Sequence, residues 1–198
     1  MSDGLIVTAT KELIQMLRPG LIAASVLLGW VVAAPRATAR PAEIFIPQLE
    51  LIQQHLPADV IMRLPSNIRL ADTDTRDLIV QIYPSEDMGE ITVALFTCDR
   101  SPHSCLVGTI SAAAASDNAQ RQFIDHQAMA TPITLGPEIQ GFLREGGRQT
   151  PPSRFSSVMW RQDGTLYTVS FRNQERSNLL RIAHLMATDN QPLRSIGQ

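Results

Sequence analysis

The sequence predicts an α+β fold with a single antiparallel sheet of six to eight strands and helices packed on one face. Short runs enriched in β-branched and aromatic residues recur from residue 78 onward, and turn-forming residues separate them. Amphipathic helical stretches lie between some of these runs, without the strand–helix alternation that a doubly wound parallel sheet requires. Hydrophobic residues make up 44% of the 198 residues and charged residues 18%, which is typical of a packed globular protein.

The first 39 residues are predicted to be a signal peptide. Basic residues precede an uncharged apolar run over residues 21–34, which is shorter than the roughly 20 residues that a membrane-spanning helix needs. An A-x-A motif ends at Ala39, which predicts cleavage between Ala39 and Arg40. No cysteine lies at this point, which excludes a lipid-modified cysteine as the anchor.

The alternative is an N-terminal membrane anchor formed by residues 20–35 and left uncleaved. Both interpretations predict that residues 40–198 form a single extracytoplasmic domain, periplasmic or secreted, and the second adds membrane association. The formal net charge of −2 is too close to zero to favour nucleic acid as a partner.

The predicted domain begins with short elements. Residues 40–47 are interpreted as a linker and residues 48–56 as a helix, with a proline in its first turn and another at its end. A first strand is predicted over residues 59–65, and a polar, turn-prone stretch follows over residues 66–77. Residues 78–83 are rich in β-branched side chains and predict the next strand.

Cys98 and Cys105 are the only cysteines, and strand-like runs lie on either side of them. The pattern predicts a β-hairpin bridged by a disulfide, which supports export to an oxidising compartment. Closing so short a loop should add roughly 2–3 kcal/mol of stability at most. With the cysteines opposite each other, Leu95 pairs with Gly108 and Val93 with Ile110. A zinc site made of the two cysteines and His103 is less favoured, because a fourth ligand and the usual spacing are missing.

A helix is predicted in the middle of the chain. Asp117, with Gln120 three residues later, resembles a capping box that opens a helix over residues 118–127. In this helix Phe123 and Ile124 are expected to face the core.

Strands over residues 131–135 and 138–144 are expected next, and the loop over residues 146–152 leads into a closing hairpin. Asp163-Gly164 is a two-residue turn signal for that hairpin. Counting outward from this turn pairs Gln162 with Thr165, Trp160 with Tyr167, Val158 with Val169 and Ser156 with Phe171. One face of the hairpin is therefore aromatic and branched.

The chain is predicted to close with an amphipathic helix. Its apolar stripe consists of Leu179, Leu180, Ala183, Met186 and Ala187. Asn173 is expected to cap the helix, and Glu175 in the first turn complements its dipole. Trp160 and the apolar face of the hairpin should dock on this stripe and complete the core.

The pattern Trp160-x-x-x-Gly164-x-x-Tyr167, followed by Leu180-x-Ile182-Ala183-x-x-Met186, resembles the closing motif of a domain of unknown function. That domain occurs in bacterial lipoproteins and in extracytoplasmic parts of sigma-factor-associated and sporulation proteins. With Ile61-Met-Arg-Leu-Pro65 and the cysteine hairpin, the chain is also similar to uncharacterised secreted proteins of cyanobacteria. The resemblance implies an envelope protein with a curved sheet, related in style to lipoprotein-carrier folds, and it implies no catalytic residues.

The sequence contains no motif that assigns catalytic, cofactor-binding or metal-binding residues. Asp99, His103 and Ser104 lie in one loop, whereas the members of a catalytic triad normally come from separate elements, so an ordinary turn is favoured. His126 is interpreted as a solvated residue near a helix end, and His184 as a partly buried residue beside the core stripe. The acidic residues Glu86, Asp87 and Glu90 lack the spacing of a calcium loop.

These observations favour a non-enzymatic cell-envelope protein that binds a partner protein or an apolar ligand such as a lipid, without a cofactor. The alternative is a small extracytoplasmic hydrolase whose site is not readable from the sequence. Function is expected at the loop over residues 146–152 and at the tip of the cysteine hairpin.

Overall fold

The computed structural model describes residues 40–85, 89–99, 102–189 and 192–196. The predicted signal peptide or anchor lies outside the described residues, as do two members of the acidic cluster, Glu86 and Asp87.

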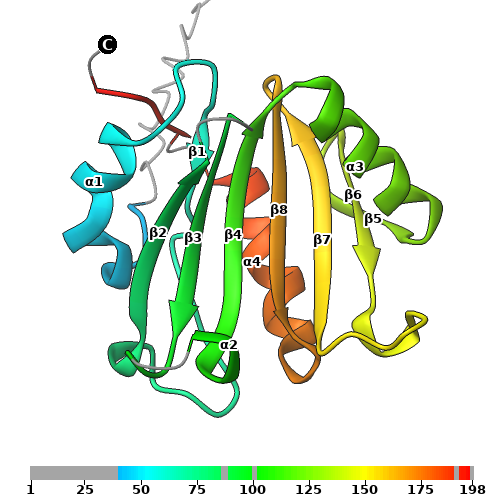
Figure 1. Ribbon diagram of the computed structural model, residues 1–198, viewed down its shortest axis with the longest axis horizontal. Helices are drawn as coiled ribbons and strands as arrows, with labels where there is room; N and C mark the ends of the chain where they lie inside the picture. The colour runs from blue at the N-terminus through cyan, green and yellow to red at the C-terminus, as the bar shows by residue number, and fades with distance from the viewer. Residues whose placement is uncertain (1–39, 86–88, 100–101, 190–191, 197–198) are drawn as a thin grey trace, which may run out of the picture. The chain divides into compact units, whose positions relative to one another are not determined.

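Seven antiparallel strands form the main sheet, in the order β2-β3-β4-β8-β7-β6-β5 (Figure 1). Their bounds are β2 (Ile79–Ser85), β3 (Glu90–Phe96), β4 (Leu106–Ala114), β5 (Thr131–Gly136), β6 (Ile139–Arg144), β7 (Phe155–Gln162) and β8 (Thr165–Arg172). A separate two-stranded sheet pairs β1 (Met62–Arg63) with β9 (Pro192–Leu193). The predicted α+β class and the predicted size of the sheet are confirmed.

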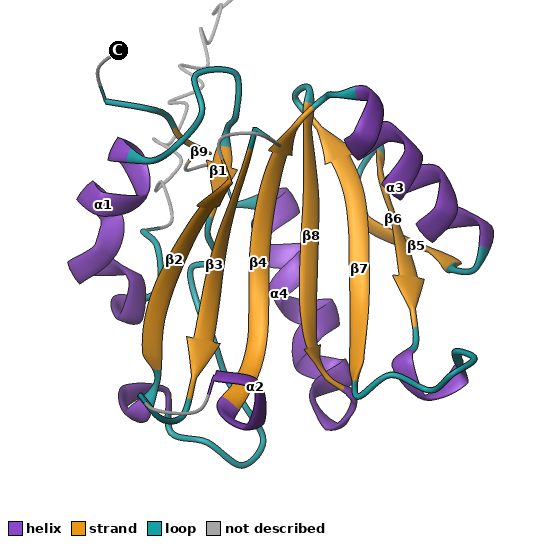
Figure 2. Cartoon of the chain, viewed as in Figure 1, coloured by secondary structure: helices purple, strands orange, loops and turns teal. Residues whose placement is uncertain are grey.

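Helices connect the strands at several points (Figure 2). The α-helices are α1 (Leu49–Gln54), α2 (Pro102–Cys105), α3 (Asp117–Ala128) and α4 (Arg176–Thr188). The 3-10 helices are η1 (Glu43–Gln48), η2 (Thr75–Asp77), η4 (Gly146–Arg148) and η5 (Asn173–Glu175).

The main core lies between α4 and one face of the sheet. Trp160, Tyr167 and Phe171 point to this face and are fully buried, together with Leu179 and Ile182 of α4. Alternate residues of a strand point to opposite faces, so every second residue of β7 and β8 reaches the helix. The predicted docking of the closing hairpin on the closing helix is confirmed.

A smaller core lies on the other face, under α3. Phe123 of α3 meets the ring of Phe142 edge-on, with 5.5 Å between the ring centroids, and Met159 and Leu166 pack beside them. Figure 1 shows α3 in front of the sheet and α4 behind it. Helices therefore cover both faces, where the sequence predicts one, because β6, β7 and β8 carry apolar residues on both sides.

The predicted register of both hairpins is confirmed. In the closing hairpin, Trp160 lies opposite Tyr167, and Asp163 and Gly164 form the turn with φ of 51° and 78°. Positive φ at both central residues is the geometry that favours an Asp-Gly turn between twisted strands. In the cysteine hairpin, Val93 pairs with Ile110 and Leu95 with Gly108, and a bulge then shifts the register by one residue.

Near the start of the domain, two predictions are corrected. The predicted linker contains η1, and Phe45 within it is fully buried in the main core. The predicted strand over residues 59–65 shortens to the two residues of β1, because its backbone pairs only with the short β9.

Both long helices begin differently from the prediction. The side chain of Ser116, rather than Asp117, caps α3 and accepts a hydrogen bond from the backbone of Ala119. Of the two residues predicted to face the core, Phe123 does so, whereas Ile124 is 52% exposed. Asn173 lies in η5, and its side chain donates to the Ser153 carbonyl instead of capping α4.

Candidate functional site

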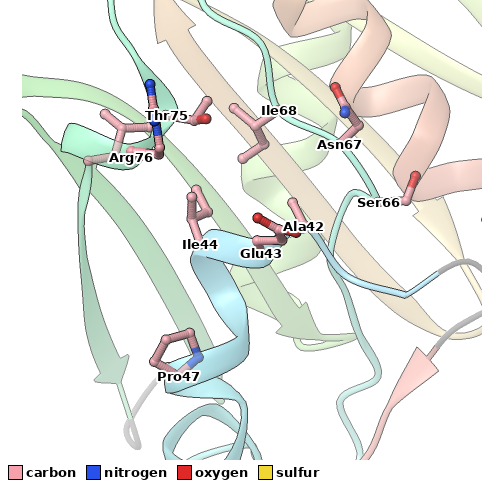
Figure 3. A pocket seen from close by; sticks show the side chains of 10 residues that line it. Ala42, Glu43, Ile44, Pro47, Ser66, Asn67, Ile68, Thr75 and Arg76 are labelled. Atoms are coloured by element: carbon pink, nitrogen blue, oxygen red, sulfur yellow. The ribbon is translucent and has the colours of Figure 1, made fainter.

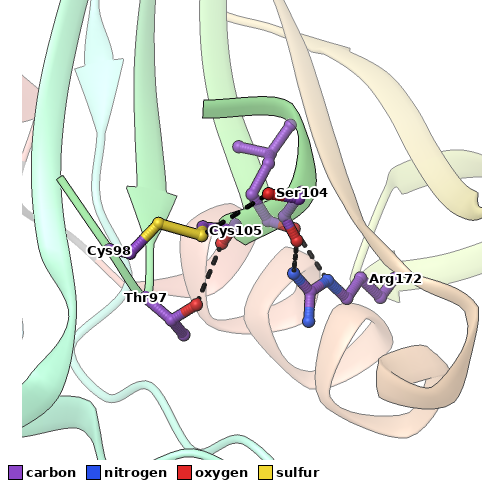
Figure 4. The surroundings of a disulfide bond; sticks show 6 residues. Thr97, Cys98, Ser104, Cys105 and Arg172 are labelled. Atoms are coloured by element: carbon purple, nitrogen blue, oxygen red, sulfur yellow. Dashed lines mark hydrogen bonds between the residues drawn. A yellow bond between two sulfur atoms is a disulfide. The ribbon is translucent and has the colours of Figure 1, made fainter. Parts of the chain in front are cut away.

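The predicted disulfide between Cys98 and Cys105 is present, with a Cα–Cα distance of 5.7 Å (Figure 4). The backbone of Thr97 donates to the carbonyl of Cys105 at 3.1 Å and continues the ladder into the bridge. With both sulfur atoms bonded to each other, no thiolate remains for the alternative zinc site. The described residues contain no group of three or more possible metal ligands.

The tip of the cysteine hairpin is fixed to the sheet by an arginine. Arg172 of β8 donates to the carbonyl oxygens of Leu106 at 2.7 Å and Ser104 at 2.9 Å. The hydroxyl of Ser104 lies 3.8 Å from the Cys105 sulfur, and Asp99 is exposed. The side chain of His103 lies outside the described part of the chain, so the hydrolase alternative stays a prediction.

A cavity of about 560 Å³ lies between η1 and the segment over residues 66–78 (Figure 3). Ala42, Ile44, Pro47, Ile68 and Leu78 supply its apolar lining. Glu43, Ser66, Asn67, Thr75 and Arg76 supply polar groups. Half of the lining residues are therefore apolar and half polar, and the volume lies in the range of sites for small organic ligands.

Local hydrogen bonds shape the two walls of this cavity, which we call the η1 pocket. On one side, the backbone of Ala42 donates to the carbonyl of Pro65 at 2.9 Å. On the other, Asp74 caps η2 and forms an ion pair with Arg76 at 2.6 Å. Hydrogen bonds from Arg76 lower the pKa of Asp74 to about 2, so the charge of this rim arginine is compensated at neutral pH.

A buried carboxylate at the start of α4 holds the segment over residues 66–78, which supplies one side of the η1 pocket. Both oxygens of Glu175 accept from the backbone N–H of Ala71 at 3.1 Å, and one also accepts from Asn178 at 2.7 Å. One turn further along α4, Arg181 donates to the side chain of Asn67 at 3.1 Å. The sequence predicts only a dipole effect for Glu175, because Ala71 lies 104 positions away in the chain.

The structure corrects the interpretation of His126. Its side chain is 6% exposed, and its Nε2–H donates to the carbonyl of Phe142 at 2.8 Å. Burial lowers the pKa of His126 below its ordinary value of 6.5, with a further lowering from the charge of Arg144. His184 lies where the sequence predicts it, beside the core, and its Nδ1 lies 2.6 Å from the carbonyl oxygen of Leu135.

We expect the stability of the protein to fall in mildly acidic solution because of His126. Its folded-state pKa lies below the unfolded-state value, so the unfolded chain binds more protons as the pH falls. The stabilisation is complete above pH 6.5 and is lost as the pH falls through the folded-state pKa. The melting temperature measured between about pH 7.5 and pH 5 tests this loss of stability. Asp74, with a pKa of about 2, stays ionised throughout that range.

The matched variants are His126→Gln, which keeps a donor for Phe142, and His55→Gln at an exposed histidine. His126→Gln should flatten the change of melting temperature with pH, and His55→Gln should leave it as it is. If the melting temperature changes with pH equally in the two variants, the loss of stability in acid does not come from His126.

Among the described residues, no helix is long and apolar enough to cross a bilayer. The disulfide is compatible with an extracytoplasmic location. No family model, curated protein or solved structure matches the chain, and its resemblance to bacterial envelope proteins stays a prediction.

Proposed function

We propose that residues 40–198 form a non-enzymatic extracytoplasmic domain that binds an apolar or amphiphilic ligand in the η1 pocket. The observation that carries the proposal is the pocket itself, about 560 Å³ and lined by both apolar and polar residues. A ligand with a short hydrocarbon part and one polar group fits this distribution of side chains.

The packing elsewhere supports this location for the ligand. The space between the sheet and α4 is filled by Trp160, Phe171 and Leu179, all fully buried, so no ligand enters there. The η1 pocket instead lies where residues 42–47 cross the segment over residues 66–78. The hydrogen bonds of Glu175 to Ala71 hold this segment in place, and a preformed wall lowers the ordering cost of binding.

The fluorescence of N-phenyl-1-naphthylamine, an apolar neutral dye, tests the proposal on the purified protein. Ile44 and Ile46 both lie in η1, but only Ile44 lines the pocket. Ile44→Gln is expected to weaken dye binding about tenfold, since an apolar side chain buried against a ligand contributes about 1.5 kcal/mol. Ile46→Gln, at a residue 44% exposed, should leave the dye affinity unchanged.

Melting temperatures of both variants separate a loss of the pocket from a loss of the fold. Mass spectrometry of the protein purified from its host envelope should then identify a co-purifying lipid or other amphiphile. A dye that does not bind the wild type, or that binds both variants with equal affinity, would refute the η1 pocket as the ligand site.

A further inference from the structure

A second cavity, of about 270 Å³, lies beside β5 and β6, at the end of the main sheet opposite to β2. Three segments build it: Met129 and Thr131 where α3 gives way to β5, residues 143–145 at the end of β6, and residues 148–150 at the end of η4 and just beyond it. The last segment belongs to the loop in which the sequence predicts function. We call this cavity the β6 pocket.

Arginine dominates the charge of the β6 pocket. Arg144 and Arg148 line it, and the only acidic side chain in its lining is Glu145. Glu145 is shared between two guanidinium groups, at 2.8 Å from Arg148 and 2.6 Å from Arg176. Among the described residues Arg144 has no carboxylate within ion-pair distance, so positive charge is in excess here.

The guanidinium group of Arg144 is poorly satisfied by the protein. Its buried Nε has no hydrogen-bond partner among the described residues, and its Nη2 donates to the sulfur of Met129, a weak acceptor, at 3.8 Å. Met129 follows the last turn of α3, whose dipole favours a cation, but a dipole supplies no acceptor for these donors. A partly buried guanidinium lacking an anionic partner is costly, and an oxyanion in the adjoining cavity would supply the missing charge.

We propose that the β6 pocket binds a phosphate group, carried either by a small molecule or by a lipid headgroup. Arg144 and Arg148 act as its charged donors, and Thr131 and Thr150 are part of the same lining. Arginine suits this ligand because its planar fork of N–H groups matches the oxygens of a phosphate. The proposal is independent of the η1 pocket, which offers an apolar lining in another part of the fold.

His126 reports on the occupancy of this site. The charge of Arg144 is one cause of the lowered pKa of His126. A phosphate bound to Arg144 neutralises part of that charge, so the pKa of His126 rises when the site is filled. If Arg144 did not bind phosphate, the pKa of His126 would stay the same when phosphate is added.

Nuclear magnetic resonance of the full-length protein tests the proposal with inorganic phosphate and with glycerol 3-phosphate. Both ligands are expected to shift the amide signals of Thr131, Arg144 and Arg148 and to raise the pKa of His126. Arg144→Gln and Arg148→Gln should each weaken binding about tenfold, the usual scale for losing a charge-assisted hydrogen bond. The control is Arg121→Gln, which removes the same charge from an exposed position on α3 outside the cavity.

A second arm distinguishes the two sources of phosphate. Vesicles of phosphatidylglycerol are compared with vesicles of phosphatidylcholine in a sedimentation assay. Binding to the anionic vesicles that Arg144→Gln weakens and Arg121→Gln does not would assign a lipid headgroup, and binding of the free phosphates alone would assign a small molecule. If neither ligand nor vesicle binds, or if Arg144→Gln and Arg148→Gln bind as well as Arg121→Gln does, the proposal is wrong. Arg148→Gln keeps the test valid if Arg144→Gln fails to fold, since the side chain of Arg148 is 81% exposed.

Discussion

Replacing Trp160 by alanine is expected to lower the free energy of unfolding by about 3–5 kcal/mol. Trp160 is fully buried between the sheet and α4, and its ring stacks on Tyr167 with 5.1 Å between the centroids. Its indole N–H donates to the side chain of Gln162 at 3.3 Å. The substitution therefore leaves a cavity at the centre of the main core and an acceptor without its donor. Urea denaturation followed by circular dichroism measures the change.

Ile124→Ala is the control for this prediction. It also removes a large hydrophobic side chain, but from the exposed side of α3, and a change within about 0.5 kcal/mol is expected. If Trp160→Ala unfolds at the same urea concentration as the wild type, the assignment of Trp160 to the core is wrong.

Replacing Gly146 by alanine is expected to cost about 3 kcal/mol, although it adds only one methyl group. An added Cβ would overlap the carbonyl oxygen of Phe155 and come within 2.5 Å of the Asn173 side-chain oxygen. The backbone of Gly146 also donates to Ser156, whose hydroxyl donates to Asn173. Overpacking usually costs 1–3 kcal/mol, and the upper end applies because a backbone carbonyl yields less than a side chain.

The neighbouring Gly147 is the matched control. A Cβ at Gly147 would meet no atom within 4 Å, and its φ is not in the left-handed region, so Gly147→Ala should change stability by less than about 0.5 kcal/mol. Thermal melting of the two variants side by side is sufficient. Equal melting temperatures would show that η4 moves aside without cost, and the close packing argued for Gly146 would be disproved.

Local patterns in the sequence predict the hairpins and the main core well. The Asp163-Gly164 turn fixes the register of β7 and β8, and the spacing of the cysteines fixes that of β3 and β4. In each case residues close in the chain decide which side chains share a face. Because Trp160 lies on the apolar face of the closing hairpin, its packing against α4 can also be predicted.

Contacts between distant segments are what the sequence does not predict. The burial of His126 depends on β6, and the exposure of Ile124 on which side of α3 meets the smaller core. The η1 pocket combines two separate segments of the chain and the β6 pocket three, so no local pattern marks them. A lone arginine such as Arg144 resembles any surface arginine until its neighbours in space are known.

The strand order of the main sheet has a consequence for how the chain folds. Every neighbouring pair of strands is also consecutive in the chain, except β4 with β8. The sheet is therefore two meanders joined along one seam, where Ile110 meets Val169 although α3 and three strands lie between them in the chain. Within the main sheet, the entropy of long-range loop closure is concentrated in that single ladder, because the other pairings of this sheet close short loops. Pairing of β4 with β8 is therefore expected to be the slowest step in forming the main sheet.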